Sequence, residues 1–334
     1  MPAANRQIWL KAYSAGVPTA ASFDLREAPI PVADEGGFVV RNLFLSVDPT
    51  ARAWATGDTS SKRVELGSTM PALAVGEVIE SNDVNFSVGD KVMGFFGWQD
   101  FAAANAAQVM RKVEDSDVPL SASLGILGLT GMTAYFGIED VCRPQAGETL
   151  VVTSAAGAVG STAAQIAKIK GCRVVGIAGG KDKVDRCLEE FGLDAAIDYK
   201  ESGELDARLR DACPSGVNCF FDNTSGPAHD AVLRQLAMHA RIAICGTAAF
   251  GSWTPWNEGP RPERHLLLKR ATMRGFSTLE YADRYDEAIA ALTGWIRDGR
   301  LRYREHILNG IESAPSSIEL LYGGGNKGKL IIRL

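Results

Sequence analysis

The chain carries two different patterns of apolar and polar residues. From about residue 38 to residue 113, short apolar runs are separated by Gly, Asp, Asn and Pro, which is typical of a compact, mostly β domain. From Gly147 onward, apolar runs that read as strands alternate with stretches of helical period. This alternation predicts an α/β domain built on a parallel, doubly wound sheet.

The second region supplies an ordered series of expected elements, in which Gly171 and Gly192 end the first two helices. We expect strands in 148–154, 172–179, 195–199, 217–223, 240–246 and 272–277, and helices in 158–170, 181–191, 205–213, 229–238 and 285–297. The final apolar run, 327–334, predicts a lone strand that returns to the first domain.

Length, charge and the distribution of apolar residues indicate the number of domains and argue against nucleic-acid-binding and membrane-spanning proteins. A chain of 334 residues is long enough for two domains. Its 35 basic and 40 acidic side chains form no charge blocks, so we expect no nucleic-acid partner. Arg6 and Lys11 interrupt any apolar signal core, which predicts a cytoplasmic location. The longest uncharged run, 118–138, contains four glycines and predicts a buried helix and loop, with no membrane span.

The cysteines and histidines give no sign of a metal site. All six cysteines lie after residue 141 without a CxxC pair, a spacing that favours free buried thiols over a disulfide framework or a zinc lobe. The four histidines also come late, so the first 141 residues hold no Cys or His for a catalytic zinc. We therefore expect no metal.

The stretch "TSAAGAVGSTAAQIAKIKG" resembles a dinucleotide fingerprint. The three positions of the GxGxxG pattern are Ala155, Gly157 and Gly160, after an expected strand and at the start of an expected helix. The second position lets the backbone approach a pyrophosphate, and the third lets the helix pack on the strand. The alternative is a corner whose glycines serve packing alone.

The end of the next strand indicates which dinucleotide. An NAD site usually carries an acid about twenty residues past the motif, whereas NADP sites use basic groups. Here the strand ends in Gly179 and Gly180 and is followed by Lys181, Lys183 and Arg186, which favours NADP(H). The alternative is that these are solvated lysines at the start of a helix.

Several motifs together resemble one family. They are "LSVDPTARA" (45–53), "GWQDF" (97–101), "GLTGMTAYFGI" (128–138), "AAGAVGS" (155–161), "GCRVVGIAGG" (171–180), "FDNTSG" (221–226), "ICG" (244–246) and "GGGNKGKLIIR" (323–333). Their order and spacing over nearly the whole chain resemble the zinc-independent medium-chain dehydrogenase/reductases, and among them the prostaglandin, leukotriene, curcumin and alkenal double-bond reductases. The resemblance implies a GroES-like substrate domain (1–124 and 298–334), a Rossmann NADP-binding domain (125–297) and a homodimer.

The resemblance also implies a set of cofactor-binding residues. They are Gly157, Ala158 and Val159 at the pyrophosphate with Gly160 beside them, Gly179, Lys183 and Tyr199 around the adenosine 2′-phosphate, Asn223, Cys245, Gly246, Phe276 and Asn326 along the ribose and nicotinamide, and Thr133 at the carboxamide. The alternatives are a core thiol for Cys245 and a turn former for Asn223 or Asn326.

The family reaction transfers a hydride from NADPH to the β-carbon of an α,β-unsaturated aldehyde or ketone, followed by protonation at the α-carbon. Charge develops on the carbonyl oxygen, so a hydrogen-bond donor there stabilises the transition state. Many relatives carry a tyrosine after "ICG" where this chain has Gly251, and many read "SVDPY" where it has Thr50. Substitute catalytic candidates are Arg52, Trp98, Trp253 and Tyr281.

Each candidate also has a structural interpretation: an ion-pair partner for Arg52, a pocket wall for the two tryptophans, and an interface residue for Tyr281. Two other functions stay open at this point. One is reduction of a quinone or interconversion of a ketone and an alcohol with the same cofactor. The other is a non-catalytic NADPH-binding module, because the fold alone does not prove turnover.

Overall fold

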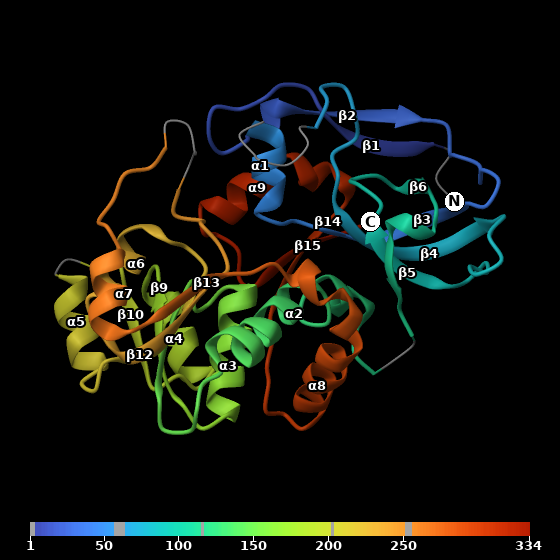
Figure 1. Ribbon diagram of the computed structural model, residues 1–334. Helices are drawn as coiled ribbons and strands as arrows, with labels where there is room; N and C mark the ends of the chain where they lie inside the picture. The colour runs from blue at the N-terminus through green and yellow to red at the C-terminus, as the bar shows by residue number, and fades with distance from the viewer. Residues whose placement is uncertain (1–3, 57–63, 115–116, 202–203, 251–255) are drawn as a thin grey trace. The chain divides into compact units, whose positions relative to one another are not determined.

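The computed structural model describes residues 4–56, 64–114, 117–201, 204–250 and 256–334 (Figure 1). The chain divides into two compact units. Unit 1 holds the residues up to 125 and those from 305 onward, and unit 2 holds 126–250 and 256–304. The expected return to the first domain at residue 298 differs from this division by a few residues, because the chain re-enters unit 1 only where strand β14 begins, at Glu305.

Unit 1 is built on a mixed sheet. In its described residues the sheet has seven strands in the order β14-β15-β3-β4-β5-β7, with β6 paired to β3, and β1 and β2 form a separate pair. The elements are β1 (Asn5–Leu10), β2 (Phe23–Ala28), β3 (Phe38–Ser46), α1 (Thr50–Thr56), β4 (Leu73–Ser81), β5 (Lys91–Phe95), β6 (Phe101–Ala104), β7 (Val109–Lys112), β14 (Glu305–Asn309), α9 (Ala314–Tyr322) and β15 (Lys329–Arg333). Strand β15 lies antiparallel to β3, which confirms that the last strand returns to the first domain.

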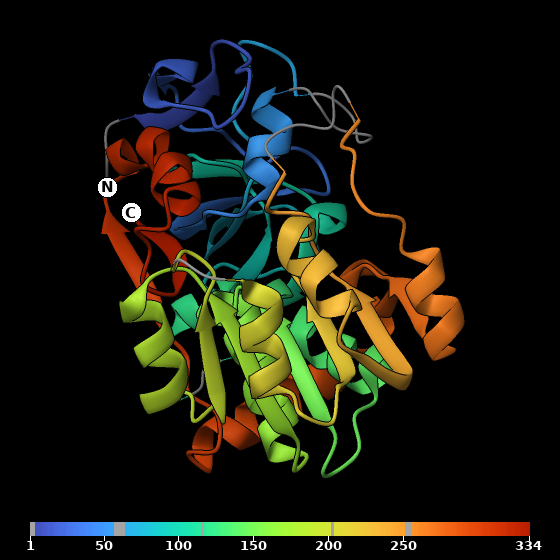
Figure 2. The ribbon, with the colours of Figure 1, turned by 90° about the vertical axis from the view of Figure 1, so that its left-hand side faces the viewer.

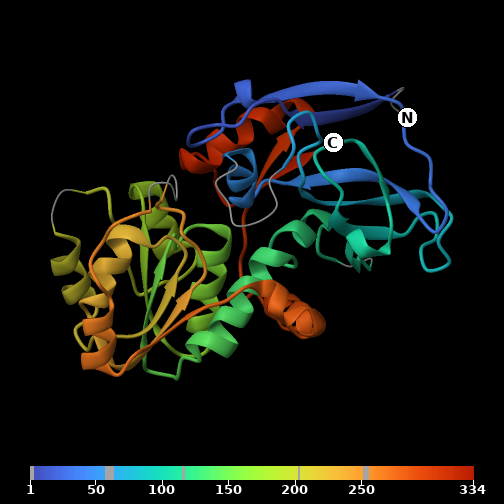
Figure 3. The same cartoon turned by 45° about the horizontal axis from the view of Figure 1, so that its top comes forward.

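Unit 2 is a parallel sheet covered by helices on both faces (Figure 3). Its described strands lie in the order β10-β9-β8-β11-β12-β13, and every pairing is parallel. The elements are α2 (Leu129–Phe136), β8 (Thr149–Thr153), α3 (Ala158–Ile169), β9 (Arg173–Ala178), α4 (Lys181–Glu189), β10 (Ala195–Asp198), α5 (Leu205–Ala212), β11 (Val217–Asp222), α6 (Gly226–Leu233), β12 (Leu236–Ile244), α7 (Glu263–Lys269), β13 (Thr272–Gly275) and α8 (Tyr285–Arg297).

The strand order of unit 2 confirms the expected doubly wound sheet. The chain leaves β8 toward β10, returns to β11 on the other side of β8, and continues to β13 (Figure 2). The order therefore reverses between β8 and β11, and in such sheets ligands bind outside the carboxyl ends of the strands at this point. All residues of β8 are buried, which agrees with the near-continuous apolar strands of the sequence.

One expected helix is wrong in its extent. The sequence predicted a helix over 229–238, but α6 ends at Leu233 and strand β12 already begins at Leu236. The reason is an irregular register between β11 and β12, with His239 at a φ of 61°. Such a bulge breaks the two-residue alternation by which a strand is recognised in a sequence.

The uncharged run and the cysteines behave as expected. Residues 118–138 form a short helical turn (Leu120–Leu124) and α2, and most of their side chains are buried. In the part of the chain that the structure describes, every helix is too short or too polar to cross a bilayer. All six cysteines are free thiols, and five of them are buried.

Candidate functional site

The fingerprint stretch forms a strand–turn–helix corner at the carboxyl end of β8. Gly157 is the N-cap of α3 and has extended backbone angles (φ −81°, ψ 171°). Ala158, Val159 and Gly160 form the first turn of α3, so their amides have no partner within the helix, and no side chain caps it. These amides and the helix dipole favour an anion such as a pyrophosphate.

A close backbone contact requires the glycine at position 160, whereas Gly157 lies against a serine side chain. A Cβ atom on Gly160 would lie 2.2 Å from the carbonyl oxygen of Ser154, and one on Gly157 would lie 2.8 Å from Ser154 Oγ. Ala155, in place of the first glycine, is fully buried and fits because Gly176 of β9 has no side chain: a Cβ there would lie 2.8 Å from Ala155 Cβ. Packing thus explains Gly160, and the uncapped amides at the start of α3 are available to an anion.

Basic side chains gather beside Gly179 at the carboxyl end of β9. A Cβ atom on Gly179 would lie 2.8–2.9 Å from the ring and hydroxyl of Tyr199, so these two residues are in direct contact. Burial lowers the pKa of Lys183, and the nearby cations Lys200 and Arg186 lower it further. Arg186 also has a buried Nη1 atom without a hydrogen-bond partner.

The two lysines at the start of α4, Lys181 and Lys183, differ in their surroundings. Lys181 is 82% exposed and pairs with Asp185 at 2.5 Å, as expected of a solvated lysine at a helix start. Lys183 is half-buried, and the described residues give it no carboxylate partner. A half-buried cation held among other cations fits a phosphate that the protein itself does not supply.

Asp198 fixes the two turns that carry this cluster. Its carboxylate accepts hydrogen bonds from the amides of Gly180 (2.8 Å) and Lys200 (2.9 Å). These two bonds hold the pKa of Asp198 below its usual range. The hydrogen bonds of Asp198 therefore hold the ends of β9 and β10 together. These ends carry the residues expected around a 2′-phosphate, Gly179, Lys183 and Tyr199.

A second group of expected residues meets on the other side of β8. The amide of Asn223 donates to Thr153 Oγ1 (2.8 Å), and its side-chain Nδ2 donates to the Thr153 carbonyl (2.7 Å). A Cβ atom on Gly246 would lie 2.7 Å from the carbonyl oxygen of Asn223, so the loops after β11 and β12 touch. Burial raises the pKa of Cys245 to about 12, which keeps its thiol neutral.

Phe276 and Thr133 are each held by contacts within unit 2. The ring of Phe276 packs edge-on against Phe221 at 6.2 Å, and Gly137 leaves room for it, since a Cβ there would lie 2.7 Å from the Phe276 ring. Thr133 Oγ1 donates to the Leu129 carbonyl at 2.6 Å and is hydrogen-bonded to Thr278 Oγ1. Thr278 therefore orients Thr133, a role that no sequence motif revealed.

Among the donor candidates, Tyr281 is held most firmly in unit 2. Its ring stacks on Phe136 with 4.4 Å between centroids and an interplanar angle of 5°. Its hydroxyl accepts a hydrogen bond from Arg274 Nη2 at 3.3 Å. Because the hydroxyl is the acceptor in this bond, its own proton stays available for donation.

The remaining candidates belong to unit 1 or lie outside the described residues. The Arg52 guanidinium lies 4.3 Å above the Tyr322 ring, a cation–π contact where an ion pair was considered. Asn326 Nδ2 donates to the Gly328 carbonyl at 2.8 Å, which is the behaviour of a turn former. Trp253 and Gly251 lie outside the described residues.

Trp98 belongs to the interior of unit 1. Its ring is fully buried in the core of unit 1, packs edge-on against Phe23, and its N–H donates to the Ser46 carbonyl at 3.1 Å. The burial of Trp98 and its satisfied N–H favour a role in packing over hydrogen-bond donation to a substrate. A part for Trp98 in the site stays a prediction, because the sequence shows that a tryptophan is apolar but not which side of a domain it faces.

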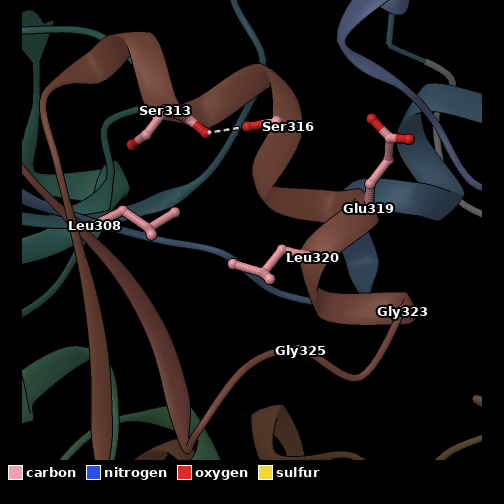
Figure 4. A pocket seen from close by; sticks show the side chains of 7 residues that line it. All are labelled: Leu308, Ser313, Ser316, Glu319, Leu320, Gly323 and Gly325. Carbon is pink, nitrogen blue, oxygen red and sulfur yellow. Dashed lines mark hydrogen bonds between the residues drawn. The ribbon is translucent and has the colours of Figure 1, made fainter.

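The described residues hold no metal cluster, and one groove lies apart from the candidate site residues. No group of three or more His, Cys, Asp and Glu side chains within the described ranges is arranged to hold a metal ion. A groove of about 610 Å³ in unit 1 lies between Leu308 of β14 and Leu320 of α9 (Figure 4). None of the candidate catalytic or cofactor-binding residues lines this groove.

Comparison with known proteins agrees with this arrangement. One family model, described as the N-terminal domain of oxidoreductase, matches residues 6–112, and another, described as zinc-binding dehydrogenase, matches residues 158–294. YfmJ of Bacillus subtilis is 42% identical over 340 residues, which span 100% of this chain and 99% of that protein.

Two further relatives extend the match. The 2-alkenal reductase (NADP(+)-dependent) of Nicotiana tabacum is 38% identical over 333 residues, covering 98% of this chain and 97% of its own. The crystal structure of CurA in complex with NADPH from Vibrio vulnificus has a TM-score of 0.91 and 37% identity, covering 98% of each chain. The chain therefore belongs to the medium-chain dehydrogenase/reductase family, in the branch of the double-bond reductases.

Proposed function

We propose that this protein uses NADPH to reduce the activated carbon–carbon double bond of α,β-unsaturated aldehydes and ketones. Its branch of the family makes it an NADP-dependent oxidoreductase that acts on such bonds. The observation that carries the choice of cofactor is the basic cluster of Lys183, Arg186 and Lys200 beside Gly179 and Tyr199. This cluster fits the 2′-phosphate by which NADPH differs from NADH.

The residues present fit the rest of the cofactor as well. The amides of Ala158 and Val159 would hold the pyrophosphate at the start of α3. Asn223, Cys245 and Gly246 meet beyond the switch point, where the nicotinamide half would lie. When bound, NADPH supplies the hydride for the β-carbon, and the chain's own residues bind, orient and shield the reactants.

A proton donor near the substrate carbonyl completes the chemistry. Charge that develops on this oxygen is stabilised by a preorganised hydrogen-bond donor. Tyr281 is our preferred donor in unit 2, because Arg274 occupies an acceptor site of its hydroxyl and polarises the remaining O–H. Arg52 and Trp253 stay candidates, and neither replaces the test of Tyr281.

The test is turnover with identified products. The purified protein would be mixed with NADPH and a panel of enones, alkenals, quinones and saturated ketones, and products would be identified by mass spectrometry. We expect saturated aldehydes and ketones, with NADPH preferred over NADH. Formation of allylic alcohols or hydroquinones alone would favour the quinone or ketone oxidoreductase. Binding of NADPH without turnover of any compound would favour the non-catalytic module.

We also propose a homodimer formed through the edge of the unit 2 sheet. Strand β13 is the last described strand of that sheet, and three of its four residues are exposed. Leu267 and Leu268 of α7, the helix beside β12, are 78% and 60% exposed. An exposed strand edge with apolar neighbours is suited to pairing with a second copy. Light scattering after size exclusion would measure the mass of the assembly.

A cytoplasmic location stays a prediction.

A further inference from the structure

Asp222 is a buried carboxylate at the carboxyl end of β11, beside the point where the strand order reverses. Its Oδ1 accepts hydrogen bonds from Thr153 Oγ1 (2.9 Å) and from the amides of Thr224 (3.0 Å) and Ser225 (2.9 Å). Its Oδ2 lies 2.8 Å from His229 Nδ1. His229 is the donor in this contact in the tautomer that carries hydrogen on Nδ1. Four donors thus compensate for its burial.

The same residue also ties down the neighbouring strand. The backbone carbonyl of Asp222 accepts the amides of Cys245 (2.8 Å) and Gly246 (3.1 Å), which follow β12. Thr153, which ends β8, in turn accepts the amide of Asn223 on its hydroxyl and Nδ2 of Asn223 on its carbonyl. Asp222 therefore connects the carboxyl ends of β8, β11 and β12.

The turn that Asp222 holds has an unfavourable backbone. Ser225 has a φ of 58° and a ψ of −157°, a conformation that residues other than glycine seldom adopt. The two amides that bond to Asp222 Oδ1 belong to Thr224 and Ser225 themselves. The carboxylate thus stabilises a strained turn next to the residues of the candidate site.

We propose that Asp222 is a positioning residue for the nicotinamide half of the cofactor. This inference rests on the proposed function. The basic cluster lies at the ends of β9 and β10, and the anion-binding amides follow β8. A dinucleotide laid along the carboxyl ends of the strands places its other half over β11 and β12. Asp222 fixes that side and lies away from the phosphate cluster.

The variants Asp222→Asn and Thr153→Val weaken this network in different ways. Asparagine keeps the size and one acceptor oxygen, but its amide group faces the Nδ1 proton of His229 and the negative charge is lost. Valine keeps the volume of Thr153 but removes the hydroxyl between Asp222 and Asn223. Thr153→Ser retains that hydroxyl and serves as the conservative rescue.

Asp194→Asn is the matched control. Asp194 also accepts a backbone amide, that of Val174 at 2.7 Å, and pairs with Lys168 at 2.8 Å. It lies at the amino ends of β9 and β10, whereas the candidate site lies at the carboxyl ends of the strands. Asp194→Asn therefore reports the loss of a structural carboxylate without a change at the strand ends that face the cofactor.

The experiment compares two ligands. Calorimetry gives the Kd of NADPH and of adenosine 2′,5′-bisphosphate, which carries the adenosine half alone, and enone reduction gives kcat. We expect Asp222→Asn and Thr153→Val to weaken NADPH binding or kcat by about 10- to 100-fold. The Kd of the bisphosphate should change by less than about twofold in both variants. Thr153→Ser and Asp194→Asn should behave like the wild type.

Two results would overturn the proposal. One is an unchanged Kd and kcat in Asp222→Asn. The other is an equal loss of both ligands, which would make Asp222 a residue of general stability. The proposed function fails separately: a wild-type protein that binds NADPH but reduces no enone contradicts the function, while the two Kd values still decide the role of Asp222. A wild-type protein that binds neither ligand overturns both.

Discussion

Replacement of Lys183 by alanine tests the cofactor cluster at its centre. Burial and the cations Arg186 and Lys200 lower the pKa of Lys183, and it has no acidic partner among the described residues. A bound 2′-phosphate would supply the missing anion. A hydrogen bond between charged groups contributes about 1.5–3 kcal/mol. Since about 1.4 kcal/mol equals tenfold in affinity, Lys183→Ala should weaken NADPH binding by about 10- to 150-fold.

The assay separates the phosphate from the rest of the cofactor. KM and Kd are measured for NADPH and for NADH, which lacks the 2′-phosphate. Lys183→Ala should leave the values for NADH within about threefold, because only the phosphate contact is removed. Lys181→Ala is the control: Lys181 is exposed and paired with Asp185, so its loss should change either Kd by less than about threefold.

Two results would refute this reasoning. If Lys183→Ala weakens NADPH and NADH equally, the lysine supports the fold and not a phosphate. If Lys181→Ala costs as much NADPH affinity as Lys183→Ala, the effect comes from general surface charge. Either outcome would remove the observation on which the choice of cofactor rests.

Four further predictions concern pH, packing, the donor and assembly. NADPH affinity should fall below about pH 6, because a phosphate monoester loses its second charge there. It should also fall at high pH, because the lowered pKa of Lys183 makes this lysine lose its charge earlier than an ordinary lysine. The affinity for NADH should stay constant across both ranges. Gly160→Ala should cost about 1–3 kcal/mol in the free energy of unfolding because its Cβ would meet Ser154, whereas Gly294→Ala, in the open interior of α8, should gain about 0.5–1 kcal/mol in thermal unfolding. Tyr281→Phe keeps the ring stack and should lower kcat by about 10²–10³-fold with little change in NADPH Kd; an unchanged kcat would exclude Tyr281 as the donor. Leu268→Asp should halve the mass measured by light scattering if α7 and β13 form the dimer contact, and a wild-type monomer would refute the dimer.

Local patterns predicted most of the elements of unit 2 and placed the residues that we propose for the phosphate at the ends of its strands. Gly160 could be predicted because its close contact is with Ser154, only six residues earlier in the chain. The strand end at Gly179 could likewise be recognised from its neighbours in the sequence. Helix α8 was expected at 285–297 and is found there, because its apolar residues recur with a regular helical period and form one buried face. The start of β12 was missed because a bulge at His239 interrupts its alternation.

What the sequence did not reveal depends on contacts between distant residues. The carboxylate of Asp222 was passed over because its partners Thr153 and His229 lie on other elements, 69 and 7 residues away. The distinction between Lys181 and Lys183 likewise needs burial, which the sequence does not contain. A signal was available for Asp222: an acid at the end of an apolar strand must find donors when it is buried.

The central claim is that the chain saturates conjugated double bonds with electrons from NADPH. The most direct measurement is mass spectrometry of the product of a single α,β-unsaturated ketone, incubated with the protein and NADPH deuterated at the transferable position. The account predicts a saturated ketone with one deuterium on the β-carbon. An allylic alcohol with deuterium on the carbonyl carbon, or no deuterium in any product, would contradict it.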